Sequence, residues 1–235
     1  MLLSQPRGAV IRATSRRNLA AGLVRLNSSY MNDHDRPTSL AGVRPAGSAM
    51  NLWFRLIWLL VSSPFRPRLE PLGDPSLLAF RVWPHDLDTS LHMNNGRYWS
   101  LMDLGRTDLM LRTGLWRAVL RHRWVPVVNT GMIRFRRELR PFQPFRIETA
   151  ILCWSESWLV IRHRVLTRGK DGGEVVAAHA LVRAALYDRA GRAYVPVARL
   201  MAEIGTVQES PPPGPEVEAF LAADDAMRES ATAPR

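Results

Sequence analysis

Hydrophobic and polar residues follow two different periods along the central part of this chain. Over residues 94–113 the apolar side chains recur every three or four positions, whereas over residues 76–84, and again after residue 124, they alternate with polar ones. The first spacing is typical of a helix with a buried face, and alternation is typical of a strand with one buried face. The pattern therefore predicts one strand, one long helix and then a series of strands.

The predicted helix over residues 94–113 is expected to lie at the centre of the fold. Asn94 fits the N-cap position, and Gly114 fits the stop after the last turn. One stripe at helical spacing contains Tyr98, Leu101, Met102, Gly105 and Leu109. Four more apolar residues widen this stripe, namely Trp99, Leu104, Met110 and Leu111. A helix with so broad an apolar surface should be enclosed on more than one side.

Four strands are predicted after this helix, over residues 125–139, 145–154, 158–167 and 174–187. The connections between them are short and rich in proline, serine or glycine. Short connections of this kind favour hairpins, so we expect the four strands to form an antiparallel meander. The predicted fold class is α+β, with an antiparallel sheet of about five strands wrapped around the long central helix.

The segments outside this central region define the other parts of the chain. Residues 1–49 are expected to be a disordered or targeting extension, because they contain arginines, no acidic residue before Asp33 and no sustained period. Three interpretations stay open for them: an organelle transit peptide within residues 1–30, disorder, or a natural start at Met50. The main domain is expected over residues 76–205, followed by a Pro-rich linker and a weak helix over residues 206–235.

Residues 50–75 are predicted to form an apolar or amphipathic helix followed by a Pro-rich linker. Tryptophan, leucine and arginine are frequent over residues 52–61, a run too short to span a bilayer. Such a helix suits peripheral contact with a membrane, because Trp and Arg each join an apolar body to a polar tip. The alternative is a helix packed on its own domain.

Composition narrows the class of protein. A chain of 235 residues suits one domain with extensions, and its single cysteine, Cys153, excludes an intrachain disulfide framework and fits a reducing compartment. The formal net charge is +11, yet Lys170 is the only lysine, so the many arginines suggest genomic codon bias as readily as a phosphate-binding surface. No motif typical of nucleic-acid-binding proteins accompanies them, and we expect no nucleic-acid partner.

Polar side chains are concentrated between the predicted first strand and the predicted helix. The segment contains Asp86, Asp88, Ser90, His92, Asn94 and Asn95. Loops held by rigid elements often carry binding and catalytic residues. Ordinary structural roles are also open to these residues, because aspartates form turns and asparagines cap helices. We expect the functional site in this segment.

The pattern D-L-D-x-x-x-H-x-N-N-x-x-Y over residues 86–98, with one strand before it and a long helix and four strands after it, resembles the hotdog-fold thioesterases. It is similar to the 4-hydroxybenzoyl-CoA and acyl-ACP thioesterase branch and to proteins like thioesterase superfamily member 6, which also begin with a Trp/Leu/Arg-rich segment. The resemblance covers residues 50–205. It implies a hotdog fold and hydrolysis of an acyl-CoA or acyl-ACP thioester to a free acid and a thiol.

The resemblance also assigns roles to individual residues. The candidate set is Asp88, His92 and Asn94 as catalytic residues, Ser90, Asn95 and Gly96 as oxyanion or substrate-positioning residues, and Asp86 and Tyr98 as supporting residues. A carboxylate can activate water or attack the carbonyl carbon, and the amides and dipole of a helix N-terminus favour an anion. The chain departs from the branch at Ser90, where the branch has an asparagine, because a serine presents no amide donor.

Partners and cofactors follow from the same reasoning. Arg134, Arg136 and Arg140 share one face of a predicted strand, and are expected either to meet coenzyme A phosphates or to form a solvated face. His163 and His179 lie on neighbouring predicted strands, but no third ligand is spaced to join them, so we expect no metal and no cofactor. The resemblance implies a homodimer or a dimer of dimers whose substrate site forms between protomers.

The function expected from the sequence is therefore that of an acyl-CoA or acyl-ACP thioesterase in the cytoplasm, at the periphery of a membrane. One alternative is a non-catalytic hotdog module that binds acyl chains or associates with a membrane. The alternative location is an organelle reached through residues 1–30. Release of free thiol from acyl-CoA substrates distinguishes the enzyme from the binding module.

Overall fold

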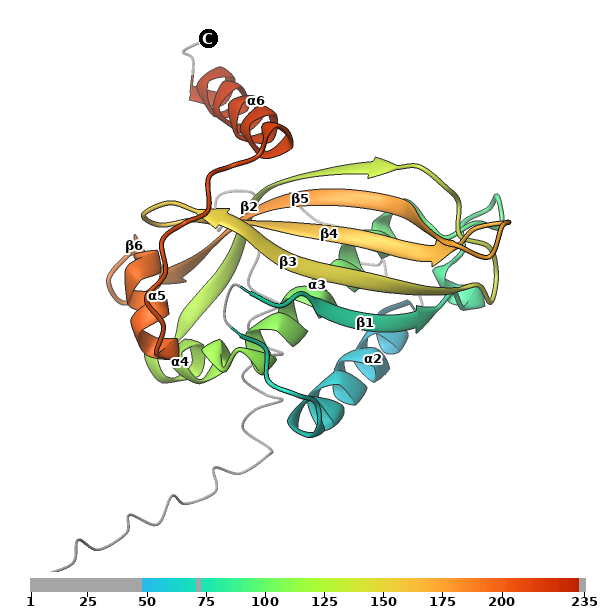
Figure 1. Ribbon diagram of the computed structural model, residues 1–235, viewed down its shortest axis with the longest axis horizontal. Helices are drawn as coiled ribbons and strands as arrows, with labels where there is room; N and C mark the ends of the chain where they lie inside the picture. Colours follow the sequence, from blue (N-terminus) through green and yellow to red (C-terminus); the bar gives the residue numbers. More distant parts are fainter. Residues whose placement is uncertain (1–47, 71–72, 233–235) are drawn as a thin grey trace, which may run out of the picture. The chain divides into compact units, whose positions relative to one another are not determined.

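The computed structural model describes residues 48–70 and 73–232 (Figure 1). In chain order the elements are α2 (Ser48–Ser62), η1 (Ser63–Phe65), β1 (Ser76–Arg81), η2 (Pro84–Asp86), α3 (Asn95–Arg112), α4 (Leu115–His122), β2 (Trp124–Phe135), β3 (Pro144–Trp154), β4 (Leu159–Arg168), β5 (Glu174–Asp188), β6 (Ala193–Tyr194), α5 (Val197–Ile204) and α6 (Pro215–Thr232). The three interpretations of the N-terminal extension fall on residues that lie outside the described ranges.

The strands form one antiparallel sheet in the order β1-β3-β4-β5-β2, with β6 paired to β5. The predicted hairpins between β3 and β4 and between β4 and β5 are confirmed. The predicted pairing of β2 with β3 was wrong, because β2 pairs with β5. Three backbone hydrogen bonds hold the connection over residues 136–143 against the segment before α3. They run from Met93 N to Leu139 O at 2.9 Å, from Phe142 N to Val82 O at 2.9 Å and from Val82 N to Gln143 O at 3.0 Å. This connection therefore crosses the end of the sheet, and β3 begins beside β1 (Figure 1).

Helix α3 lies against one face of the sheet, and the predicted central helix is confirmed. The whole predicted stripe is buried: Tyr98, Leu101, Met102, Gly105 and Leu109. Helix and sheet are in close contact at Gly105, where a Cβ atom would collide with the Thr149 hydroxyl of β3. A glycine is needed there because any side chain would push α3 away from the sheet.

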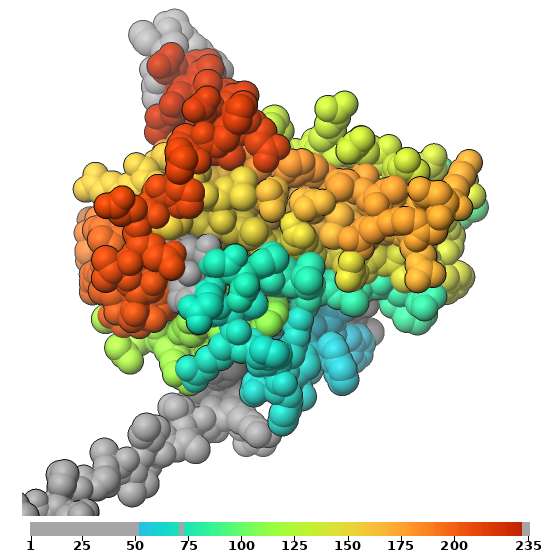
Figure 2. Space-filling model, viewed as in Figure 1, coloured from blue at the N-terminus to red at the C-terminus, as the bar shows by residue number. Residues whose placement is uncertain are grey.

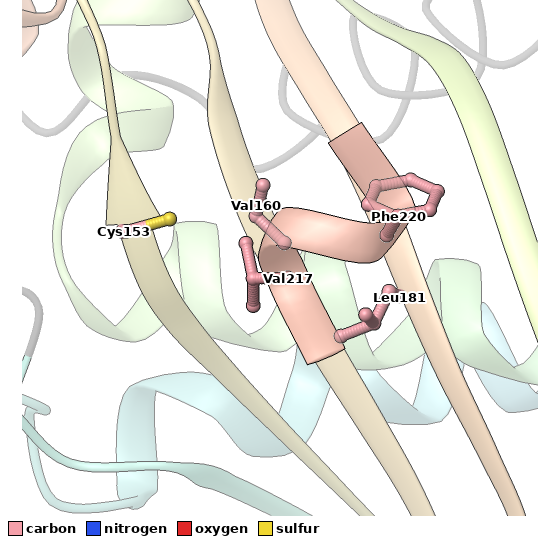
Figure 3. Close-up of a cluster of buried hydrophobic side chains, with 5 residues drawn as sticks. All are labelled: Cys153, Val160, Leu181, Val217 and Phe220. Atoms are coloured by element: carbon pink, nitrogen blue, oxygen red, sulfur yellow. The ribbon is translucent and has the colours of Figure 1, made fainter. Parts of the chain in front are cut away.

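Helix α6 packs on the opposite face of the sheet. Its Val217 and Phe220 join Cys153, Val160 and Leu181 in one buried cluster, which Figure 3 shows between the helix and strands β3 to β5. Asp224, also buried, pairs with Arg183 of β5 and accepts a hydrogen bond from Thr130 of β2. The predicted C-terminal helix is thus confirmed, and it is an integral part of the packed domain.

Helix α2 and the connection after it also pack on the domain. Leu56 and Leu59 are buried. Further along, Leu69 N donates to Arg112 O at 3.3 Å, and Arg112 Nε donates to Pro67 O at 2.8 Å, so the Pro-rich segment is fixed to the end of α3. Within the described residues no helix combines the length and apolarity needed to cross a bilayer. Helix α2 is therefore packed on its own domain through its inner face.

Candidate active site

The predicted site segment forms a closed loop between β1 and α3. Residues Leu87 and Met93 make a β-bridge across its base, and Asp88 N donates to His92 O at 2.8 Å. Leu91, at the tip, has a φ of 58°, a left-handed conformation that is uncommon for a leucine. The hydrogen bond from Leu91 N to Asp88 O at 3.1 Å holds this turn. The loop therefore has one defined shape, with the Asp88 carboxylate inside it.

Asp88 is half-buried and partly engaged by its own loop. Its Oδ1 accepts hydrogen bonds from Ser90 N at 2.9 Å and from His92 N at 3.3 Å. Within the described residues its second oxygen, Oδ2, accepts no hydrogen bond. The turn-forming role and the chemical role considered for Asp88 are compatible, because one oxygen orders the loop and the other is available to a water or a substrate. Ser90 contributes its backbone N–H to this arrangement.

The start of α3 supplies the candidate oxyanion donors. Asn94 is the N-cap: its Oδ1 accepts from Gly96 N at 2.8 Å, and its own N–H donates to Asp86 O at 2.9 Å. The predicted donor Gly96 is therefore already engaged. In the part of the chain that the structure describes, the backbone N–H of Asn95 donates no hydrogen bond. The geometry narrows the predicted oxyanion donors to the backbone N–H of Asn95, an exposed residue at the positive end of the helix dipole.

The imidazole of His92 points to a partner that the sequence did not indicate. Its Nε2 pairs with Glu138, an exposed carboxylate in the connection between β2 and β3. Tyr98 lies nearby, fully buried against the ring of Phe135 with centroids 5.1 Å apart. Burial, with a smaller contribution from Glu138, raises the pKa of Tyr98 to about 12, so its hydroxyl is neutral at physiological pH. The structure thus adds Glu138 to the candidate site.

Asp86 fixes the loop to two helices. Its carboxylate is only 1% exposed and pairs with Arg55 of α2 at 2.6 Å and with Arg97 of α3 at 3.3 Å. It also accepts a hydrogen bond from Trp83 N at 3.0 Å. These contacts occupy both carboxylate oxygens of Asp86, and its backbone O accepts a hydrogen bond from Asn94 N. Asp86 therefore lies directly beneath the N-terminus of α3, and its supporting role in the reaction stays a prediction.

A second polar chain lies under the middle of α3. Arg106 pairs with Asp103 and donates to His163 Nε2 at 3.0 Å, while His163 Nδ1 lies 3.0 Å from Thr149 Oγ1. Burial, followed by the charge of Arg106, lowers the pKa of His163 well below its usual value, so the imidazole is neutral. Because Arg106 can only donate, the ring proton belongs on Nδ1 and is donated to Thr149. The chain joins α3 to β3 and β4.

The arginines predicted to share a strand face do not do so. Strand β2 ends at Phe135, so only Arg134 lies on it, and Arg136 and Arg140 belong to the connection that crosses the end of the sheet. All three arginine side chains are exposed.

The two strand histidines lie on opposite faces of the sheet. His163 contacts Arg106 of α3, and His179 faces Glu216 of α6 at 3.8 Å. Burial lowers the pKa of His179. Across the described ranges, no three His, Cys, Asp or Glu side chains gather in a way that would hold a metal ion.

Comparison with known proteins places this loop and helix in a family. The thioesterase-like superfamily matches residues 82–221. The protein THEM6 of Xenopus laevis is 31% identical over 126 residues, which cover 53% of this chain and 61% of that protein. A probable thioesterase of Saccharomyces cerevisiae is 27% identical over 107 residues, or 45% of each chain. The chain thus spans less than two thirds of the length of these relatives.

Solved structures show the fold. A mutant 4-hydroxybenzoyl-CoA thioesterase complexed with 4-hydroxybenzoyl-CoA has a TM-score of 0.51 and 16% identity, and covers 57% of this chain and 100% of that one. The 4-hydroxybenzoyl-CoA thioesterase of a Pseudomonas strain has a TM-score of 0.50 and 20% identity, over 56% and 99% of the two chains. The curled antiparallel sheet around α3 is a hotdog fold. With a family match that extends over more than half of its length, from the site loop to α6, this chain belongs to the thioesterase-like superfamily.

Proposed function

We propose that this protein hydrolyses the thioester of an acyl-CoA or acyl-ACP substrate to a free acid and a thiol. One observation carries the proposal: the Asp88 carboxylate keeps one oxygen available in a loop that leads directly into the N-terminus of α3. A base or nucleophile next to anion-stabilising amides is what acyl transfer requires. Membership of the thioesterase-like superfamily supports the same reaction.

The geometry suggests how the reaction would proceed. As a base, Asp88 takes a proton from water, whose oxygen adds to the carbonyl carbon. The negative charge that develops on the carbonyl oxygen is stabilised by the Asn95 amide and the α3 dipole. The C–S bond then breaks, and the proton passes to the departing thiolate. As a nucleophile, Asp88 would instead form an acyl anhydride that water hydrolyses. His92 and Asn94 hold the loop and the cap in place.

Relatives support the substrate class. The name of the yeast relative describes a probable thioesterase, and another relative is the thioesterase lcsJ of Purpureocillium lilacinum, 25% identical over 167 residues. Contacts of coenzyme A phosphates with Arg134, Arg136 and Arg140 belong to the proposal, because all three side chains are exposed. For location we propose the cytoplasm, at the periphery of a membrane, with an organelle as the alternative.

Release of free thiol from a panel of acyl-CoAs and acyl-ACPs of increasing chain length tests this function. We expect turnover of at least one member without added metal or cofactor. Loss of this turnover in Asp88→Asn assigns the activity to the site. Tight binding of acyl groups without thiol release across the whole panel would contradict hydrolysis and favour the acyl-binding module.

We further propose that the protein forms a homodimer or a dimer of dimers. Strand β2 is at the end of the sheet order, and an edge strand of this length offers unpaired backbone groups to a second copy. Its Met132 is 48% exposed. Light scattering at micromolar concentration is expected to give a dimer or tetramer, and Met132→Glu should shift it toward the monomer, whereas Met227→Glu on α6 should not. A strictly monomeric wild type would contradict the proposal.

A further inference from the structure

Helix α2 is apolar around most of its circumference. Over residues 52–61 its only charged side chain is Arg55, and that side chain turns inward to Asp86 and to Arg81 O at 3.2 Å. Leu56 and Leu59, on the same inner side, are buried against the domain. A helix that is hydrophobic on all sides usually has both sides covered. The domain covers one side of α2 only.

The outer face of α2 carries large apolar side chains in two adjacent rows. We use the name α2 outer face for Trp53, Phe54, Ile57, Trp58, Val61 and Phe65. Trp58 is 72% exposed and Phe65, just past the helix end, is 82% exposed. Figure 2 shows α2 at the surface together with the Pro-rich connection that follows it. A group of neighbouring large apolar side chains with this much exposure marks a contact with a membrane or with another molecule.

Charge distinguishes a lipid surface from a protein partner. Between Asp35 and Glu70 the sequence contains no acidic residue, and its arginines there are Arg36, Arg44, Arg55, Arg66 and Arg68. Two tryptophans lie on the α2 outer face, and the ring of Trp joins an apolar body to a polar N–H that suits the headgroup level of a bilayer. Arg55 and Arg66 pair with Asp86 and Asp108, so the uncompensated positive charge of this segment comes from Arg36, Arg44 and Arg68. This charge and the aromatic apolar face together complement an anionic membrane surface.

We propose that the α2 outer face docks on the surface of an anionic lipid bilayer. The face consists of exposed side chains that the domain does not bury, so docking requires no unfolding of α2. The inner face of the same helix reaches the site through the Arg55 and Asp86 pair. If the proposed hydrolysis holds, docking would bring the Asp88 loop close to a surface where long acyl thioesters accumulate. The docking itself does not depend on that function.

Sedimentation of the full chain with lipid vesicles tests the docking. We use vesicles of phosphatidylcholine alone and of an equal mixture of phosphatidylcholine and phosphatidylserine. The wild type is expected to bind the mixed vesicles more tightly, and Phe54→Ser with Trp58→Ser should weaken that binding by roughly 10- to 100-fold, because two exposed aromatic side chains no longer insert. Val207→Ser with Met227→Ser removes two exposed apolar side chains elsewhere and should leave binding unchanged.

Each other result overturns the proposal. A wild type that binds neither vesicle, or a double mutant that binds as the wild type does, would show that the α2 outer face does not meet lipid. Equal binding to both vesicles would refute the anionic preference. If the double mutant instead changes only the oligomeric state in light scattering, a second copy covers this face. Thiol release in vesicle-free buffer tests the proposed function separately, so the two failures are distinguishable.

Discussion

Asp88→Asn is expected to lower kcat for a good acyl-CoA substrate by about 100- to 10,000-fold, the range typical of losing a general base. Asparagine has nearly the same shape, and its Oδ1 can still accept hydrogen bonds from Ser90 N and His92 N. The loop should therefore keep its conformation. What is lost is the basic, negatively charged oxygen, because the amide nitrogen at the Oδ2 position can neither take a proton nor attack a carbonyl. KM should change much less than kcat.

A matched control lies two residues away. Ser90→Ala keeps the backbone N–H that donates to Asp88 and removes only the exposed hydroxyl, so kcat is expected to stay within about threefold of the wild type. Thermal unfolding of both mutant proteins checks that the fold is retained. If Asp88→Asn turned over the substrate at the wild-type rate, hydrolysis would have to be assigned elsewhere. A large loss in Ser90→Ala would instead give the hydroxyl a direct chemical role.

Local signals in the sequence were sufficient for the centre of the fold. The apolar stripe and the N-cap Asn94 depend on residues within a few positions of one another, and α3 forms as these residues predict. Gly114 was expected only as a helix stop. Its φ of 84° ends α3, but α4 (Leu115–His122) begins directly after it, and eight residues are too few for their period to show in the sequence.

Strand order and long-range pairs could not be read from periodicity. An alternating segment fits any neighbouring strand, so the short connection before β3 suggested a hairpin that the backbone bonds of Leu139 and Phe142 exclude. The same limit applies to the site. The contacts that Asp88 and Asn94 make within the loop follow from nearby residues, whereas Arg55 is 31 positions from Asp86 and Glu138 belongs to another connection.

Asp86→Asn is expected to lower the free energy of unfolding by about 3 to 5 kcal/mol, the usual cost of removing one partner from a buried ion pair. Arg55 and Arg97 are only 12% and 15% exposed, and an amide does not compensate their charges. Because Asp86 lies beneath the start of α3, the loss should also shift Asn94 and the Asn95 amide. We therefore expect kcat to fall by roughly 10- to 100-fold at nearly constant KM, as for a misplaced catalytic group.

Asp108→Asn is the control that separates positioning from stability. Asp108 is equally buried and is paired with two arginines, Arg66 at 2.7 Å and Arg112 at 3.3 Å, but it lies 13 positions past the first residue of α3, or about 20 Å along the helix axis. Urea unfolding should show a similar loss of stability in both mutant proteins, whereas kcat should fall only in Asp86→Asn. If Asp86→Asn does not fold, Arg97→Gln removes one of the two charges and should show a smaller effect of the same kind. Equal losses of kcat in the Asp86 and Asp108 mutant proteins would mean that Asp86 acts on turnover through stability alone.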